Sequence, residues 1–161
     1  MYITNEYTKD QKIQLGNFIK TTSRYNKNLT PRTEIEVDRW LNRKLVFWVN
    51  HNNEPVGWVV CEPINYITYE LKSLYVLPEF TRKGLATSLI QESSKVQSYN
   101  YIASTYNLSV TYLFHTNGFE LINLTKLPKK TLLDFVMTRK MSSIIKSIRR
   151  KSYICYKKKH D

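Results

Sequence analysis

The sequence is poor in cysteine, in acidic residues and in long apolar runs, and these scarcities exclude several classes of protein. Its two cysteines, Cys61 and Cys155, lie far apart and lack the short spacing of metal ligands, which is typical of a reduced cytoplasmic protein. No apolar run reaches the length of a membrane span, and the polar start, 1–10, is unlike a secretory signal. We therefore expect a cytoplasmic protein with no transmembrane segment and no metal.

Acidic residues are few relative to bases: 13 Asp and Glu stand against 25 Lys and Arg, a net charge of +12. The excess is uneven, because residues 126–161 hold 12 bases against Asp134 and Asp161 and so carry a net charge of +10. The basic character therefore belongs to the C-terminal part of the chain. The 161 residues suffice for one domain with its own core.

The end of the chain predicts a basic extension beyond that domain. Ile144, Ile145 and Ile148 lie on one side of a predicted helix and bases surround them. The sequence predicts a domain over 1–140 and a helical extension over 141–161. The extension either docks on the domain with a solvated charged end or binds nucleic acid or an anionic surface.

The most informative stretch runs from Tyr69 to Gln97. Its first part, Tyr69–Leu77, is rich in β-branched, aromatic and aliphatic residues and predicts a strand that ends before Pro78. A basic turn with Gly84 follows, and then a helix whose apolar face carries Leu85, Leu89 and Val96, with Ala86 and Ile90 beside them. The first N–H groups of a helix have no partner within it and carry partial positive charge, so this arrangement favours an anion such as a pyrophosphate.

Two segments resemble the GNAT superfamily of N-acetyltransferases. The run 81–86, TRKGLA, is similar to that family's (Arg/Gln)-x-x-Gly-x-(Gly/Ala) signature, with Thr81 in place of Arg or Gln. The run 107–119 is similar to the family's Asn-x-x-Ala-x-x-(Phe/Leu)-Tyr-x-Lys-x-Gly-Phe pattern. There Val110 replaces Ala, Phe114 replaces Tyr and Thr116 replaces Lys. The two matches occur in the family's order, and the resemblance covers about residues 1–140.

The resemblance implies an α+β fold, the three-layer α/β/α acetyltransferase fold, with a mixed, mostly antiparallel central sheet flanked by helices. Sequence patterns predict the elements of such a fold. The predicted helices cover Thr8–Lys20, a short segment capped by Thr33 and Glu36, and Ser109–Thr116; a polar loop is predicted over Ser23–Thr30. The other predicted strands are Leu45–Val49, Val56–Cys61 with a bulge or close approach at Gly57, Tyr101–Thr105, Phe119–Leu124 and Leu132–Thr138.

The resemblance also implies acetyl-CoA as co-substrate and assigns residues to it. The main chain of Leu74, Tyr75 and Val76 is expected to pair with the pantetheine arm like an added strand. The pyrophosphate is expected to lie on Arg82, Lys83, Gly84, Leu85, Ala86 and Thr87. Asn107 is expected to contact the cofactor arm or to cap a helix, and both roles use the same position.

Catalysis needs a base, because an alkyl ammonium has a pKa of about 10 and must lose its proton. Glu70 is the favoured base, since burial in an apolar strand would raise the pKa of its carboxyl group. A salt bridge to Lys72 is the competing interpretation, and Glu62 and Tyr66 are weaker alternatives. Phe114 replaces the tyrosine that protonates the leaving thiolate in the family, so water, Tyr112, His115 or unassisted departure must serve instead.

The predicted function is transfer of an acetyl group from acetyl-CoA to a primary amine by direct attack in a ternary complex. The acceptor is an amino acid or a protein or peptide amine. Bases in 23–30 and 123–130, which include Arg24, Lys27 and Lys126, suit an anionic acceptor. The alternatives are a non-catalytic acyl-CoA-binding module and an RNA-associated acetyltransferase that uses the basic extension. A homodimer is compatible with each.

Overall fold

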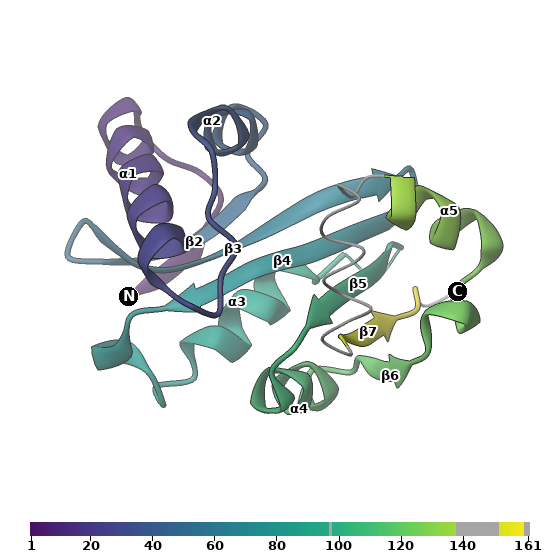
Figure 1. The fold of residues 1–161 in the computed structure, drawn as a ribbon. Helices are drawn as coiled ribbons and strands as arrows, with labels where there is room; N and C mark the ends of the chain where they lie inside the picture. Colours follow the sequence, from purple (N-terminus) through teal and green to yellow (C-terminus); the bar gives the residue numbers. More distant parts are fainter. Residues whose placement is uncertain (97, 138–151, 160–161) are drawn as a thin grey trace. The chain divides into compact units, whose positions relative to one another are not determined.

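The computed structural model describes residues 1–96, 98–137 and 152–159, and it divides the chain into two compact units (Figure 1). The first unit comprises Met1–Glu62 and Lys72–Lys95, and the second comprises Pro63–Leu71 and Val96–Asp161. Strands β3 (Glu54–Asn65) and β4 (Thr68–Val76) contribute residues to both. The described strands follow the order β1-β2-β3-β4-β5-β7-β6. β4 and β5 are parallel, whereas β1-β2, β2-β3, β5-β7 and β6-β7 are antiparallel, so the predicted mixed, mostly antiparallel sheet is confirmed.

The first unit begins with β1 (Tyr2–Thr4) and two helices, α1 (Lys9–Tyr25) and α2 (Glu34–Asn42). Both helices start with the predicted capping box, in which a threonine hydroxyl and the side chain three residues later each accept a backbone N–H of the other residue. The helix α1 continues beyond the predicted end at Lys20, so the predicted loop over 23–30 begins only after Tyr25.

Strands β2 (Val46–His51) and β3 bury both of their faces, because successive side chains point to opposite sides of a sheet. On one face, Trp48 and Trp58 pack with the apolar sides of α1 and α2 in a core that also holds Trp40. On the other face, Cys61 donates its S–H to the main-chain oxygen of Ser93 in α3 (Leu85–Ser93). Helices therefore cover both faces of these strands, as the three-layer fold requires.

The second unit holds β5 (Asn100–Thr105), α4 (Leu108–Thr116), β6 (Glu120–Ile122), α5 (Lys129–Met137) and β7 (Tyr153–Lys157). A core of Ile102, Phe135 and Ile154 joins α5 to β5 and β7. The helix α4 contacts β5, β6 and β7 and ends, as predicted, at Asn117 and Gly118. Gly118 has a φ of +82°, the left-handed conformation that a glycine adopts without strain at a helix C-terminus.

Two predicted elements are wrong. The predicted strand over Leu132–Thr138 is wrong for residues 132–137, which belong to the helix α5, in which Thr131 and Phe135 are buried and Leu133 and Met137 are exposed. Each pair is four residues apart, which is a helical repeat and not a strand repeat. Pro128 directly before the helix is the signal that could have indicated it.

The predicted helix over 141–161 is wrong for Tyr153–Lys157, which form β7. This strand lies between β5 and β6. Ile154 packs with Phe135 of α5, and α4 also contacts β7, so Ile154 and Cys155 are both buried. Residues 153–157 therefore belong to the sheet, which the predicted division after residue 140 did not anticipate. The predicted apolar side at 144–148 lies outside the described residues.

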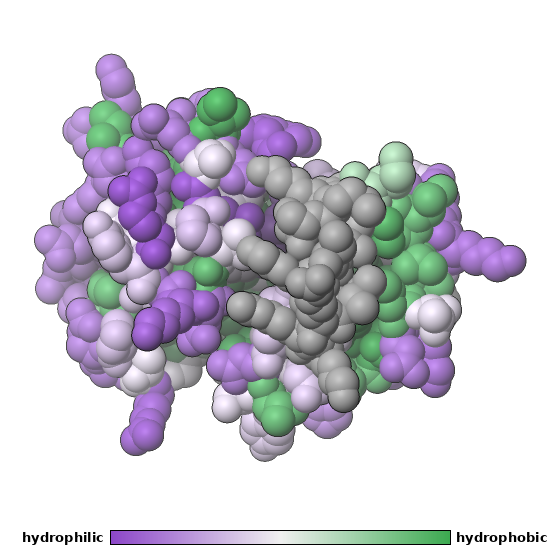
Figure 2. Space-filling view, in the orientation of Figure 1, coloured by the Kyte–Doolittle hydropathy of each residue, from purple (hydrophilic) through white to green (hydrophobic). Residues whose placement is uncertain are grey.

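The surface over α1 and α2 is mainly hydrophilic, and the surface over α5 is mainly hydrophobic (Figure 2). Leu133 and Met137 contribute to the latter, with exposed fractions of 62% and 76%. Among the described residues, no helix is long and apolar enough to cross a membrane, and no three His, Cys, Asp or Glu side chains cluster as metal ligands would.

Both cysteine thiols are predicted to be unreactive because they are buried. Burial raises the pKa of the Cys61 thiol to about 12 and that of the Cys155 thiol to about 11. A thiol is nucleophilic only as thiolate, so neither cysteine should react with a thiol-specific disulfide reagent at pH 8 in the native protein, and both should react in urea. Because the folded-state pKa values are raised, the stability that the two thiols contribute is present below their unfolded pKa and declines as the pH rises toward 11–12. Rapid labelling of the native protein at pH 8 would contradict this burial.

Candidate active site

The second half of β4 has an edge that β5 does not use. The pairing of β4 with β5 runs from Thr68 to Leu71 and ends at the Leu71–Ala103 pair. On the other side, the N–H of Leu77 donates to the main-chain oxygen of Val56 in β3 at 2.9 Å. Because main-chain groups alternate along a strand, those of Leu74 and Val76 point away from β3. They are placed to pair with an extended ligand.

A bend separates the two halves of β4. Ser73 has a φ of +59°, the left-handed conformation that non-glycine residues adopt at a cost. One contact that holds the bend is a hydrogen bond from Nη2 of Arg32 to Oγ of Ser73, at 2.6 Å. The bend lies immediately before Leu74, so it sets the direction in which the candidate ligand-binding edge runs.

Gly57 brings β3 unusually close to this part of β4. A Cβ at Gly57 would lie 3.0 Å from the main-chain oxygen of Tyr75 and 3.2 Å from Cγ2 of Val76. The β2–β3 register also shifts opposite this point, between Val49 and Asn50, so the predicted bulge and the predicted close approach are both present.

The side chain of Tyr75 connects the same strand to α1. The ring centroids of Tyr75 and Phe18 of α1 are 6.1 Å apart. Burial, and then the negative charge of Glu79, raise the pKa of the Tyr75 hydroxyl group. The phenol is therefore protonated at neutral pH.

The turn after β4 exposes a series of backbone N–H groups. It starts as a short 3₁₀ helix, Pro78–Phe80, and Thr81 Oγ1 donates to the main-chain oxygen of Pro78 at 2.7 Å. The sign of φ then alternates, with Arg82 at +60° and Gly84 at +75°. Such alternation turns successive N–H groups toward one side and makes a concave site for an anion.

The helix α3 begins at this turn without a capping side chain. Gly84 is its N-cap residue, and the first helical bond runs from the N–H of Ser88 to the main-chain oxygen of Gly84. The N–H groups of Leu85, Ala86 and Thr87 precede that bond and lack an acceptor within the helix. A Cβ at Gly84 would meet nothing within 4 Å, so the requirement for glycine is conformational and the space before the helix is open.

Two cations flank this helix start. Arg82 and Lys83 are exposed, and Lys83 Nζ lies 4.7 Å from the ring centroid of Phe80. The predicted helical face is confirmed at Leu89 and Ile90, which are buried, but Val96 lies beyond the end of α3 and is 45% exposed. The segment 82–87, which is predicted to hold the pyrophosphate, is thus a basic helix start in which Arg82, Lys83 and Gly84 are exposed.

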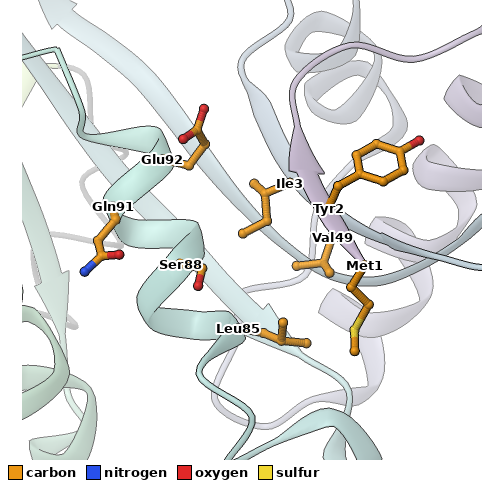
Figure 3. A pocket seen from close by; sticks show the side chains of 8 residues that line it. All are labelled: Met1, Tyr2, Ile3, Val49, Leu85, Ser88, Gln91 and Glu92. Carbon is orange, nitrogen blue, oxygen red and sulfur yellow. The ribbon is translucent and has the colours of Figure 1, made fainter.

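A cavity of about 350 Å³ lies beside α3 (Figure 3). The side chain of Leu85 enters it from the helix, facing apolar side chains of β1 and β2 (Figure 3). Its remaining lining residues are Met1, Tyr2, Ile3, Val49, Ser88, Gln91 and Glu92.

The other predicted site residues belong to the second unit. Glu70 is 5% exposed and pairs with Ile102 of β5. Asn107 caps α4, since its Oδ1 accepts the N–H of Ser109 at 2.9 Å, and the N-cap interpretation is therefore correct. Phe114 is 3% exposed and packs edge-on against Phe119, with ring centroids 5.0 Å apart, so it is a core residue of this unit.

The weaker candidates for proton transfer lie in other surroundings. The Glu62 carboxylate forms ion pairs with Arg39 Nη2 at 2.7 Å and with Lys72 Nζ at 2.5 Å. Tyr66 is 71% exposed, beneath Lys130. Tyr112 is equally exposed, and its neighbour His115 is also at the surface. The bonds of Glu62 were not expected from the sequence, because the contacts of Arg39 and Lys72 depend on α2 packing beside β3 and β4.

The family is shown by comparison with known sequences. A model described as the acetyltransferase (GNAT) family matches residues 15–96, about half of the chain, which include β4, the glycine turn and α3. The chain therefore belongs to the acetyltransferase (GNAT) family. The predicted family, and with it the enzyme class of acyltransferases, is confirmed.

Solved structures share the fold. N-acetylglutamate synthase from Neisseria gonorrhoeae, in complex with coenzyme A and N-acetyl-glutamate, is 16% identical with a TM-score of 0.70; the match covers 99% of this chain and 35% of that one. A Mycobacterium tuberculosis protein in complex with CoA is 14% identical, with a TM-score of 0.74 and 98% of both chains covered. A GNAT-family acetyltransferase from Staphylococcus aureus is 16% identical, with a TM-score of 0.67 and 97% of both covered. No curated protein matches the sequence. The chain thus spans about a third of the Neisseria protein and nearly all of the other two.

Gly57→Ala should destabilise the protein by about 1–3 kcal/mol, because the new Cβ would press on the main-chain oxygen of Tyr75. Urea unfolding measures this loss. Gly16→Ala is the matched control: its Cβ would lie 3.3 Å from a side-chain methyl of Leu41 and not from backbone, inside a helix that alanine favours. A Gly57→Ala protein as stable as the Gly16→Ala protein would contradict the close approach.

Proposed function

We propose that the chain is an acetyl-CoA-dependent N-acetyltransferase that acetylates a primary amine, such as that of an amino acid, by direct attack in a ternary complex. The observation that carries this proposal is the glycine-opened start of α3, placed directly after a strand whose Leu74 and Val76 main chain faces away from β3.

The two features suit the two ends of one ligand. A pyrophosphate would accept the N–H groups of 84–87, and Arg82 and Lys83 would add positive charge. The pantetheine arm carries amides, and these would pair with the main chain of β4 as an added strand does. Leu74, Tyr75 and Val76 would provide those groups, and a main-chain N–H there would polarise the thioester oxygen. The Oδ1 atom of Asn107 already caps α4, so Asn107 would contact the cofactor arm mainly through the NH2 group of its side chain.

The choice of an amino acid as acceptor is supported by likeness to the Neisseria synthase, whose complex contains N-acetyl-glutamate. That protein is N-acetylglutamate synthase, and the present chain shares its fold over about a third of its length. A protein or peptide amine remains the alternative acceptor.

In the proposed reaction, Glu70 takes the proton from the acceptor's ammonium, directly or through one water. The nitrogen lone pair then attacks the carbonyl carbon of the thioester, the C–S bond breaks and the thiolate leaves, and the nitrogen releases its remaining extra proton to solvent water to give the amide. Because Phe114 has no proton to donate and is packed against Phe119, water protonates the thiolate. The thiolate is a fair leaving group unaided, since a thiol pKa is about 8.5.

Phe114 also favours a second candidate, a module that binds acyl-CoA with little or no turnover. Release of free thiol from acetyl-CoA over a panel of amines separates the two. The RNA-associated role, the homodimer and the cytoplasmic location stay predictions.

Acetyl-CoA should bind with micromolar affinity, and Gly84→Val should weaken binding at least about tenfold. A β-branched residue resists a φ of +75°, at a cost of about 1–2 kcal/mol, and would close the turn. Gly84→Asn is the matched control, because asparagine tolerates the left-handed conformation. Isothermal calorimetry measures acetyl-CoA binding by both variants. If the unsubstituted protein does not bind acetyl-CoA, the proposal is wrong.

Glu70→Gln should lower kcat about 10²-fold at pH 7 while leaving acetyl-CoA affinity unchanged. The deficit should shrink as the pH approaches the pKa of the acceptor's ammonium, because the amine then needs no base. The control is Glu54→Gln, an exposed carboxylate at the start of β3. Unchanged kcat in Glu70→Gln would exclude Glu70 as the base.

A further inference from the structure

Ser73 has a strained backbone conformation inside a strand. Its φ is +59°, although β4 continues on both sides of it. The other described non-glycine residues with a positive φ all lie in turns; they are Lys44, Asn52, Asn53 and Arg82. A left-handed conformation is unfavourable for a residue with a Cβ, so contacts around Ser73 must hold it in place.

A hydrogen bond from Arg32 is one such contact. Arg32 Nη2 donates to Ser73 Oγ at 2.6 Å, across 41 residues of sequence, and the bond is partly buried. Because the guanidinium is charged, this bond is stronger than one between two neutral groups. It reaches the side chain of the strained residue itself, so it acts at the point where the strand changes direction.

Arg32 is itself held by two helices of the first unit. Its main-chain N–H donates at 3.1 Å to Oγ of Ser23, a fully buried residue near the end of α1. Its Cζ lies 5.2 Å from the ring centroid of Trp40, a fully buried residue of α2. The next residue, Thr33, forms the capping box of α2. Both the main chain and the guanidinium of Arg32 are therefore fixed, which makes Arg32 a firm support for the bend of β4.

The two ends of the proposed acetyl-CoA site depend on different backbone features. The bend at Ser73 directly precedes Leu74 and sets the direction of the main chain that is proposed to pair with the pantetheine arm. The pyrophosphate turn depends instead on the left-handed conformation of Gly84, further along the chain. A change at the bend should therefore disturb binding of the arm and leave binding of the pyrophosphate intact.

We propose that Arg32 is a positioning residue for the pantetheine arm of acetyl-CoA, and that it acts through Ser73 by holding the bend of β4. In this role Arg32 places the strand, and the main chain of the strand places the thioester. The inference rests on the proposed function, and it concerns how the thioester is held rather than how it reacts.

The first test compares acetyl-CoA with ADP, which carries a pyrophosphate but no pantetheine arm. Arg32→Met keeps an unbranched side chain beside Trp40 but has no donor for Ser73. It should weaken acetyl-CoA binding about tenfold, because a hydrogen bond from a charged group is lost, and should leave ADP binding unchanged. Arg32→Lys keeps a charged donor and should recover part of the loss. Calorimetry measures the affinity for acetyl-CoA, and NMR titration measures that for the smaller ligand.

Two variants of Ser73 form a matched pair, because both lose the hydroxyl acceptor and they differ by one methyl group. Ser73→Ala must still adopt a positive φ with a Cβ, so it should weaken acetyl-CoA binding as Arg32→Met does. Ser73→Gly adopts that conformation without strain, so it should bind acetyl-CoA nearly as well as the unsubstituted protein. Adding Arg32→Met to Ser73→Gly should cause little further loss, because the two residues act as one unit.

The surface control is Arg43→Gln, at an exposed arginine at the end of α2, which should change neither affinity. Retained ADP binding and an unchanged melting temperature would show that a variant is folded; if Arg32→Met does not fold, the Ser73 pair decides. Equal weakening of both ligands by Arg32→Met, or no weakening of either, would overturn the inference. So would a Ser73→Gly protein that binds acetyl-CoA as weakly as Ser73→Ala.

The same measurements separate this inference from the proposed function. If the unsubstituted protein does not bind acetyl-CoA, both are wrong. If the variants bind acetyl-CoA as expected but no amine is acetylated, the enzymatic proposal fails and the positioning role of Arg32 stands. If amines are acetylated and all variants bind acetyl-CoA equally well, the function holds and the positioning role is wrong.

Discussion

The approach of β3 to β4 at Gly57 is the constraint on which the rest of the candidate site depends. The absence of a side chain there lets the main-chain oxygen of Tyr75 come within 3.0 Å of where a Cβ would stand. This close approach holds the second half of β4 tightly against β3. The other edge of β4, with Leu74 and Val76, stays available for an extended ligand. The turn and the first residues of α3 follow directly in the chain, so their direction depends on the same contact.

Charge and backbone geometry act together around this strand. On one side of the bend at Ser73, a glycine turn presents main-chain N–H groups; the bend itself is bonded to Arg32. The oriented amides of the turn favour an anion, and the exposed Arg82 and Lys83 beside them add positive charge.

Local signals in the sequence predicted much of this fold. Thr8 and Thr33 each form the capping box that their spacing indicates, and Gly84 and Gly118 adopt the left-handed conformations that the motifs require. Prediction failed where tertiary contacts decide. The segment with Phe135 is apolar enough for a strand, and its packing on Ile102 and Ile154 favours the helix. Likewise, no motif marks Arg32 or Lys72, whose contacts with the Trp40 ring depend on the tertiary structure.

The position of β7 has a consequence for how the protein is made. A ribosome delivers β5 and β6 first, yet neither is the other's neighbour in the sheet, since β7 lies between them. Until residues 153–157 emerge, the edges of both earlier strands that β7 will cover remain bare. Unpaired edges are what nascent chains use to associate wrongly. The strand β7 therefore closes both edges only after it has emerged, and until then the second unit is exposed to misassembly.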